Sequence, residues 1–378
     1  MIKYLGSKRT LIPALLDAVR GAVDTPTPTV FDLFSGTSRV GHALKAAGCR
    51  VIANDHNAYA HALAMCYVQA DADDLEHDAA RLIAELNTLP GTPGYFTRTF
   101  CERSRYLHPR NGERIDAIRD AIARKSLAPE LEAVLLVSLM EAADRVDSTT
   151  GVQMAYLKAW APRAHNALDL RVPALLPRAA AGKGQALRLD ALEAARTIRA
   201  DVAYVDPPYN QHSYLGNYHV WETLVRWDKP EVYGVACKRV DCRERRSAFN
   251  SRARCREALR EVLAALDVRA VVVSLSNEGF VEPEQMREML AALWGGSALV
   301  EARTFDYPRY VGARIGIYNP LGVKVGRVSH LRNTEHLFIA TRAGRARKSP
   351  GSSEPGLVVS ASKCPPSVAS PISGPRSS

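Results

Sequence analysis

The segment from residue 29 to residue 55, TVFDLFSGTSRVGHALKAAGCRVIAND, constrains the fold of this chain more than any other. TVFDLF predicts a strand, SGTSR a turn, and VGHALKAA a helix that ends at Gly48. CRVIAND then predicts a second strand. This order predicts the β-α-β opening of an α/β sheet.

The rest of the chain predicts one sheet that a block of helices interrupts. From Asn57 to about Leu187 the apolar residues recur at three- and four-residue intervals, as in PELEAVLLVSLMEAADRV. Strand patterns return at QALRLD, DVAYVD, RAVVVSLS, ALVEAR and EHLFIAT. We therefore expect an α/β domain at residues 1–70 and 185–342, a helical insertion at 71–184, and a disordered basic tail at 343–378.

The composition is that of an ordinary soluble protein, with 47% hydrophobic and 24% charged residues among 378. No apolar run approaches the ~18 residues that a membrane span requires, and MIKYLGSKRT lacks the apolar core of a signal peptide. We expect a cytoplasmic protein with no membrane partner. The seven cysteines form no CxxC pair, which predicts reduced thiols and no metal site.

Basic residues concentrate between Lys238 and Arg256, in the stretch KRVDCRERRSAFNSRARCR. The chain carries a formal net charge of +10, and such a stretch suits a polyanion such as nucleic acid. A solvated helix face explains the charges equally well. The candidate nucleic-acid-binding residues are Lys238, Arg239, Arg243, Arg245 and Arg246.

The turn of the first β-α-β unit predicts a nucleotide-binding loop. Gly36-Thr37-Ser38-Arg39-Val40-Gly41 joins the first strand to its helix, and Asp55 ends the next strand. A carboxylate at that point can accept hydrogen bonds from two ribose hydroxyls. Turns without a ligand use the same residues about as often. Ser38 stands where a second loop glycine is expected, and a positive φ would strain it by ~1 kcal/mol.

The strand DVAYVD runs directly into PPY, which makes an unusually stiff and polar strand end. The two prolines remove backbone donors, so the segment offers carbonyl acceptors beside the Asp206 carboxylate. Tyr209 adds an aromatic face on which a base could stack. These groups predict a clamp for the exocyclic amine of a base, whereas a proline-stiffened turn is the simpler alternative.

Five motifs in order resemble the DNA adenine-N6 methyltransferases that use S-adenosylmethionine. KYLGSK resembles the N-terminal cofactor motif of that family, DLFSGTSRVG its glycine loop, and NDHN its ribose-binding strand end. RLD resembles its adenine-contacting motif and DPPY its catalytic motif. In the group concerned, the cofactor loop comes first and a helical recognition insertion precedes DPPY. The resemblance covers most of residues 1 to 340 and implies a Rossmann-like methyltransferase sheet.

The resemblance also implies roles for individual residues. Tyr4 would pack against the cofactor, Lys8 would meet its carboxylate, Asp55 would hold its ribose and Asp190 its adenine amine. The other cofactor-binding candidates are Asp32, Ser35, Gly36, Thr37 and Asp206. Asp206 and the Pro207 carbonyl would accept hydrogen bonds from the target amine, and the catalytic motif is completed by Pro208 and Tyr209.

The implied partner is double-stranded DNA, and a cognate restriction enzyme stays open as a second one. Methyl transfer to an RNA base amine, or a catalytically inactive DNA-binding relative, are the alternatives. Residues 139–160, LMEAADRVDSTTGVQMAYLKAW, turn from an apolar helix into a polar loop that either reads bases or caps the helix. Tyr214 and His212 are placed for the substrate, whereas Trp221 and Trp227 fit a helix core.

Overall fold

The computed structural model describes residues 1–308, 317–318, 324–326 and 332–342. One compact unit runs from Met1 to Ala343, and the predicted tail lies outside the described residues. None of the helices in the described part of the chain is long and apolar enough to cross a membrane.

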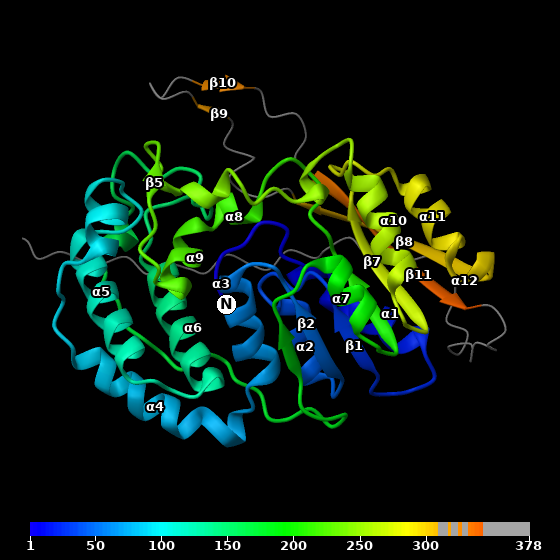
Figure 1. Ribbon diagram of the computed structural model, residues 1–378, viewed down its shortest axis with the longest axis horizontal. Coiled ribbons are helices and arrows are strands. Elements are labelled where there is room, and N and C mark those ends of the chain that lie inside the picture. The colour runs from blue at the N-terminus through cyan, green and yellow to red at the C-terminus, as the bar shows by residue number, and fades with distance from the viewer. Residues whose placement is uncertain (309–316, 319–323, 327–331, 343–378) are drawn as a thin grey trace, which may run out of the picture. The chain divides into compact units, whose positions relative to one another are not determined.

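Seven strands form the central sheet, in the order β3-β2-β1-β4-β7-β11-β8 (Figure 1). Neighbours from β3 to β7 are parallel, and β11 is antiparallel to both β7 and β8. This arrangement confirms the predicted Rossmann-like α/β class. The strands of the sheet are β1 (Thr29–Asp32), β2 (Arg50–Asn54), β3 (Gln185–Leu187), β4 (Val202–Val205), β7 (Ala270–Ser276), β8 (Ala298–Pro308) and β11 (Arg332–Arg342).

Two further pairs of short strands lie outside this sheet. They are β5 (Val232–Tyr233) with β6 (Lys238–Arg239), and β9 (Ile317–Tyr318) with β10 (Lys324–Gly326). Both pairs are antiparallel.

Helices cover both faces of the sheet, and its central strands are therefore buried on both sides. Every residue of β4 and β7 is buried, as the continuous apolar runs VAYV and AVVVSLS require of parallel strands. One face packs on α1 (Ile12–Ala22) and α2 (Arg39–Ala46). The other packs on α7 (Ala191–Thr197), α10 (Cys255–Ala265) and α11 (Pro283–Ala291), which is followed by α12 (Leu293–Gly296).

A third apolar core lies among the helices of the predicted insertion and helices on either side of it. They are α3 (Ala58–Ala64), α4 (Ala72–Thr88), α5 (Pro109–Arg124), α6 (Pro129–Arg145) and, from further along the chain, α8 (Tyr214–Asn217) and α9 (His219–Arg226). α3 continues into a π-helical turn, Met65–Gln69, and a second π-helical turn spans Thr97–Glu102. Figure 1 shows α4, α5 and α6 beside the sheet.

This helical core does not stop at residues 71 and 184. Ile2 and Tyr59 enter it from before the insertion, and Tyr218 and Trp221 enter it from after. Trp221 is buried as predicted, and Trp227 packs against the same core with its indole Nε1 2.6 Å from Asp120 Oδ1. The helical segment is therefore packed into the same compact unit as the sheet.

The turn between β1 and α2 adopts the backbone that its sequence suggests. Gly36 has φ of 51° and Ser38 has φ of 56°, both in the left-handed region. Ser38 is fully buried and immediately precedes α2, so the chain accepts the strain of a side chain there. Ser38 thus has the positive φ at which a side chain is strained.

Asp116 on α5 holds the start of the second π-helical turn. Its carboxylate accepts from the backbone N–H groups of Gly94, Phe96 and Thr97 at 2.8 to 2.9 Å, and from Thr97 Oγ1 at 2.7 Å. Asp116→Ala should lower the free energy of unfolding by about 3 kcal/mol or more, because these buried donors lose their acceptor. Urea unfolding measures this loss.

Asp78→Ala is the matched control for this substitution. Asp78 makes an exposed ion pair with Arg81 at 3.1 Å, so its removal should change stability by no more than about 0.5 kcal/mol. Equal losses in the two variants would contradict the structural role of Asp116.

Candidate active site

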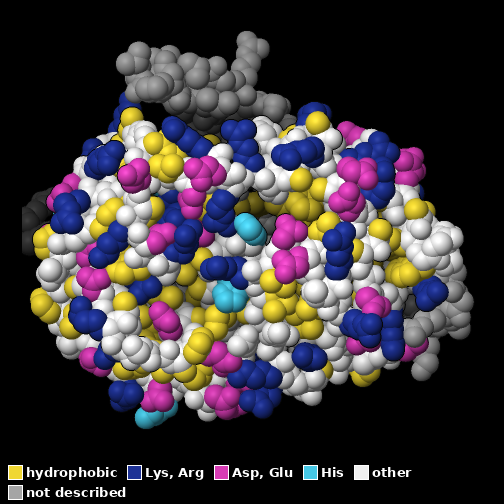
Figure 2. All heavy atoms as spheres, in the orientation of Figure 1, with side chains coloured by type: hydrophobic (Ala, Val, Ile, Leu, Met, Phe, Trp, Pro, Cys, Tyr) yellow, Lys and Arg dark blue, Asp and Glu magenta, His cyan; other side chains and the backbone are white. Residues whose placement is uncertain are grey.

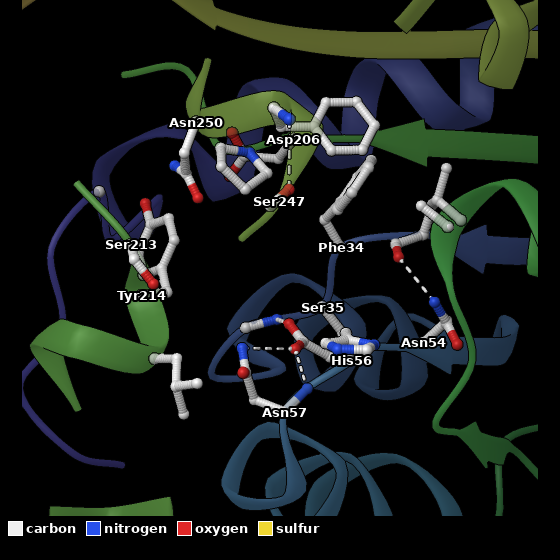
Figure 3. A pocket seen from close by; sticks show the side chains of 18 of the residues that line it. Phe34, Ser35, Asn54, His56, Asn57, Asp206, Ser213, Tyr214, Ser247 and Asn250 are labelled. Carbon is white, nitrogen blue, oxygen red and sulfur yellow. Dashed lines mark hydrogen bonds between the residues drawn. The ribbon is translucent and has the colours of Figure 1, made fainter. Parts of the chain in front are cut away.

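Three carboxylates meet where neighbouring parallel strands end. Asp32 closes β1, Asp55 follows β2 and Asp206 follows β4. β1 pairs with both β2 and β4, so the strand order reverses at β1. Open α/β sheets bind ligands beside such a switch point, at the carboxyl ends of the strands. A cavity of about 530 Å³ opens here. Figure 2 shows a hollow near the centre of the face in view, and Figure 3 shows residues that line the cavity.

Asp55 ties the glycine loop to the end of β2. Its Oδ2 accepts from the Gly36 N–H at 3.1 Å, and its Oδ1 accepts from the backbone and side-chain amides of Asn57 at 2.9 and 3.2 Å. Burial raises the pKa of Asp55 to about 6, and these hydrogen bonds limit the rise. The predicted pairing of the loop with this acid is present in the structure.

Tyr4 packs against the glycine loop from the N-terminal segment. A Cβ on Gly36 would lie 3.2 Å from the Tyr4 ring, so the ring occupies the space that glycine leaves. The Tyr4 ring also stacks on the rings of Tyr214 and Tyr218, with its centroid 5.2 Å and 4.6 Å from theirs, respectively. Tyr4 and Tyr214, both predicted site residues, therefore lie together beside the loop.

Asp32 is a buried acid that faces the cavity without a good hydrogen bond. Its side chain is 1% exposed, and neither carboxyl oxygen has a hydrogen-bond partner among the described residues. Burial raises the pKa of Asp32 to about 8, with further contributions from Asp206 and Asp55, and the nearby Gly41 N–H, although too poorly aligned for a hydrogen bond, offsets part of the rise. The buried hydroxyl of Ser35, also in the lining, likewise has no partner in the described part of the chain.

Asp206 lies beside a lysine that is shared with a second acid. Lys8 Nζ is 3.1 Å from Asp206 Oδ1 and 2.5 Å from Glu335 Oε1 on β11. Burial raises the pKa of Asp206 to about 6, Lys8 lowers it and Glu335 raises it. Burial lowers the pKa of Lys8, but the two carboxylates outweigh this effect and raise it well above its usual value. Lys8, for which a contact with a cofactor carboxylate is expected, lies between two protein carboxylates.

The segment after Asp206 is fixed from two sides. The Tyr209 carbonyl accepts from the Phe280 N–H at 2.9 Å, and the Asn250 side-chain amide donates to the carbonyls of Asn210 and His212 at 2.8 and 3.2 Å. Pro208 lines the cavity, whereas Pro207 is buried. Sequence reasoning missed Asn250, because it lies within the predicted basic stretch and nothing local shows its contact with the segment that follows DPPY.

The far end of the cavity is apolar, with a polar rim. Phe34 meets Phe249 edge to face, with ring centroids 5.1 Å apart, and Leu189 also lines the cavity. Asp190 lines the cavity at the start of α7, and its Oδ1 accepts from the Leu192 N–H at 2.9 Å. This part of the site has the flat apolar walls and the acceptor that suit a purine.

The predicted basic stretch divides into buried and exposed members. Arg239 is 1% exposed and pairs with Asp228 at 2.7 Å and with Asp241 at 3.0 Å, so its prediction as a nucleic-acid contact is wrong. Arg245 lines the cavity and is held by Glu222 at 3.2 Å.

Three of the five predicted contacts remain at or near the surface. Arg243 and Arg246 are exposed, and Lys238 is half-buried. The Arg243 guanidinium lies 3.7 Å from the centroid of the Tyr233 ring. Basic side chains gather along the upper edge of the face in Figure 2, above its hollow.

The polar loop after α6 is anchored at its base. Asp147 pairs with Lys3 at 2.7 Å and with Arg163 at 2.8 Å, and the Ser148 N–H donates to the Tyr106 carbonyl at 2.7 Å. Beyond this anchor the loop exposes Met154, which is 42% accessible. The loop is thus braced against its surroundings and exposes one apolar side chain.

Asp32 gives the folded protein a distinctive pH dependence. Its pKa of about 8 exceeds the ordinary value, so between about pH 4 and pH 8 the folded state holds a proton that the unfolded state has released. The free energy of unfolding should therefore fall as pH rises, by at most about 1.4 kcal/mol per pH unit. Asp32→Asn should flatten this dependence in urea unfolding measured near pH 5 and near pH 8.

The exposed Asp267, which pairs with Arg199 at 2.8 Å, provides the control variant Asp267→Asn. It should keep the pH dependence of the unsubstituted protein. The same slope in Asp32→Asn would mean that Asp32 is ionised in the folded state.

Comparison with known proteins gives a consistent set of relatives. The modification methylase StsI of Streptococcus sanguinis is 28% identical over 82% of this chain and 49% of its own length. The type II methyltransferase M.FokI of Planomicrobium okeanokoites is 29% identical over 76% of this chain and 46% of its own. The chain thus spans about half the length of these two relatives.

A third relative matches along most of its length. The type II methyltransferase M.NlaIII of Neisseria lactamica is 30% identical over 76% of this chain and 87% of its own. Residues 4–289 also match a protein-family model. The chain belongs to the family that this model describes, the D12 class N6 adenine-specific DNA methyltransferases.

Proposed function

We propose that this protein transfers a methyl group from S-adenosylmethionine to the N6 amine of adenine in DNA. The observation that carries the proposal is the Asp206 carboxylate, which sits at the carboxyl end of β4 and is 20% exposed beside the cavity. An acidic acceptor there, next to a proline-rich segment without N–H donors, suits an amine. Membership of the adenine-specific family supports the same base and atom.

The cavity fits the proposed cofactor. Asp32 and Ser35 present buried oxygen atoms without hydrogen-bond partners in the described structure, as a ligand with ammonium and hydroxyl groups requires. Asp55 would hold the ribose, and Asp190 with the apolar wall at Leu189 would hold the adenine. Gly36 and Thr37 would let the backbone approach the ligand. Tyr4 would pack beside it.

The residues of this chain would act mainly by position and charge. S-adenosylmethionine supplies an activated methyl group on a sulfonium, so no nucleophile from the protein is required. Asp206 and the Pro207 carbonyl would accept hydrogen bonds from the target amine and direct its lone pair toward the methyl carbon. Tyr209 would stack on the base once it has left the duplex.

We further propose that double-stranded DNA lies across the face that carries Arg243, Arg246 and the loop at Met154. Exposed guanidinium groups suit phosphates, and the polar loop after α6, with its exposed Met154, suits a base-reading element. A restriction enzyme of the same specificity would be the functional partner, because the relatives are named a modification methylase and a type II methyltransferase. The expected location is the cytoplasm.

An RNA base amine is the alternative substrate, because Asp206 recognises an amine and not a sugar. Tritium transfer from labelled cofactor to duplex DNA, to single-stranded RNA and to protein separates the two. Transfer to RNA alone would overturn the DNA assignment. Binding of the cofactor without transfer to any of them would indicate an inactive DNA-binding relative.

Substitution of Asp206 tests the proposed chemistry directly. Asp206→Ala should reduce single-turnover methyl transfer to duplex DNA about 10³-fold, because the target amine loses its charged acceptor. Calorimetric titration should find cofactor affinity only modestly weakened, since Asp32, Asp55 and Asp190 remain. Tyr209→Ala should retain more activity, with a loss of roughly 10- to 100-fold, because stacking positions the base without polarising it.

The control for both variants is Asp267→Ala, which removes an exposed carboxylate distant in the sequence from every motif. It should methylate DNA at the rate of the unsubstituted enzyme. Near-normal transfer by Asp206→Ala would show that the DPPY clamp, and with it the proposed function, is wrong.

The exposed arginines test the proposed DNA face. Replacing Arg243 and Arg246 together by alanine should weaken binding about equally for all sequences and reduce the salt dependence, with a slope lower by about 2. Arg245 stays in place because it braces the cavity. The measurement is fluorescence anisotropy of labelled duplexes over a range of salt concentrations.

Replacing the exposed Arg81 and Arg199 instead removes the same charge from other surfaces. This double variant should keep the original slope. If both double variants lower the slope equally, the effect is one of net charge and the proposed face is incorrect.

A further inference from the structure

Three charged side chains meet beneath the DPPY segment, and only one belongs to that motif. Lys8 Nζ lies 3.1 Å from Asp206 Oδ1 and 2.5 Å from Glu335 Oε1. The same Glu335 oxygen accepts from Ser274 Oγ at 2.9 Å. Glu335 comes from β11, beyond the residues 4–289 that match the family model.

The position of Glu335 is costly unless its charge has a use. The residue is 1% exposed and lies in register with Ser276 of β7. Leu337 and Ile339, two and four residues further along β11, are buried apolar side chains. A buried carboxylate costs several kcal/mol in desolvation, and an apolar side chain would fill the same place at lower cost. Its charge is balanced by Lys8, so its use should be sought there.

The geometry divides one ammonium between two carboxylates. The Lys8 contact with Glu335 is shorter than its contact with Asp206 by 0.6 Å, the difference of 3.1 and 2.5 Å. A lysine with Asp206 as its only partner would bind that carboxylate tightly. The target amine would then have to compete with Lys8 for the acceptor that positions it.

We propose that Glu335 is a positioning residue, which draws the Lys8 ammonium toward β11 and thereby keeps Asp206 available as an acceptor for the target amine. The inference rests on the proposed function of Asp206 and extends it to a strand outside the recognised motifs. Lys8 remains close enough to hold Asp206 in place. Glu335 sets how strongly it does so.

Three other titratable groups face Asp206, and they are largely uncharged near pH 7. They are Tyr204 on β4, Tyr214 on α8 and Asp32 on β1. Burial raises the pKa values of both tyrosines well above their usual range, so they stay neutral. Burial also raises the pKa of Asp32 to about 8, so this acid is largely protonated near pH 7. Lys8 and Glu335 are thus the charges that control Asp206.

Glu335→Gln keeps the shape of the side chain and removes its charge. Because Glu335 raises the pKa of Asp206 and Lys8 lowers it, the variant should have a more acidic Asp206 bound more firmly by Lys8. Single-turnover methyl transfer to duplex DNA above about pH 7 should fall about 10-fold or more. The acid limb of its pH profile should move to lower pH, while cofactor affinity by calorimetry stays within about twofold of the original.

Two further variants frame this result. Glu335→Asp keeps the charge on a shorter side chain, so both changes should be smaller, and it carries the same measurements if Glu335→Gln does not fold. Glu301→Gln neutralises a partly exposed acid on β8, which pairs with Arg303 at 2.8 Å, and should alter neither rate nor pH profile.

A measurement without turnover separates this inference from the proposed function. Carboxyl ¹³C NMR of selectively labelled protein, with the Asp206 signal assigned by its loss in Asp206→Asn, follows the titration of Asp206 directly. The midpoint should move to lower pH in Glu335→Gln even if the protein methylates some other substrate. An unchanged midpoint, or an unchanged rate and pH profile in an active enzyme, would overturn the role of Glu335.

Discussion

The pairing of β1 with both β2 and β4 is the constraint on which the site depends. Because all three strands run in the same direction, Asp32, Asp55 and Asp206 emerge at one edge and share a poorly solvated cavity. Burial raises the pKa of each one. The result is a cavity whose acids hold protons more readily than usual, and a cationic ligand would favour their ionised form and be stabilised by it. The proposed sulfonium cofactor has that charge.

Local patterns in the sequence predicted the parts of the fold that local forces determine. The β-α-β opening was predicted in this way, and the positive φ at Ser38 and the contact of Asp55 with the glycine loop likewise involve residues near one another in the chain. Lys8 and Tyr4 were identified only by resemblance to a family. Their observed partners, Glu335 and Tyr218, are far away in the sequence and have no local signature.

The predictions that failed or fell short concern charge and domain limits. Arg239 reads as one more exposed arginine in a basic stretch, yet two acids hold it in the interior. Glu335 is a single acid in the apolar strand EHLFIAT, and this contrast was the available sign of a buried ion pair. The predicted limits of the insertion, residues 71 and 184, follow the sequence pattern. The helical core also includes segments outside these limits, such as α9, which follows β4 in the sequence.

The N-terminal segment connects parts of the protein that are synthesised long after it. Lys3 contacts Asp144 and Asp147 beside α6, the Leu5 N–H donates to Tyr218 Oη at 2.7 Å, and Lys8 reaches Glu335 across 327 residues of sequence. A ribosome must therefore release β11 before the first eight residues can find their last partner. A chain that ends before β11 therefore lacks the carboxylate that shares Lys8 with Asp206.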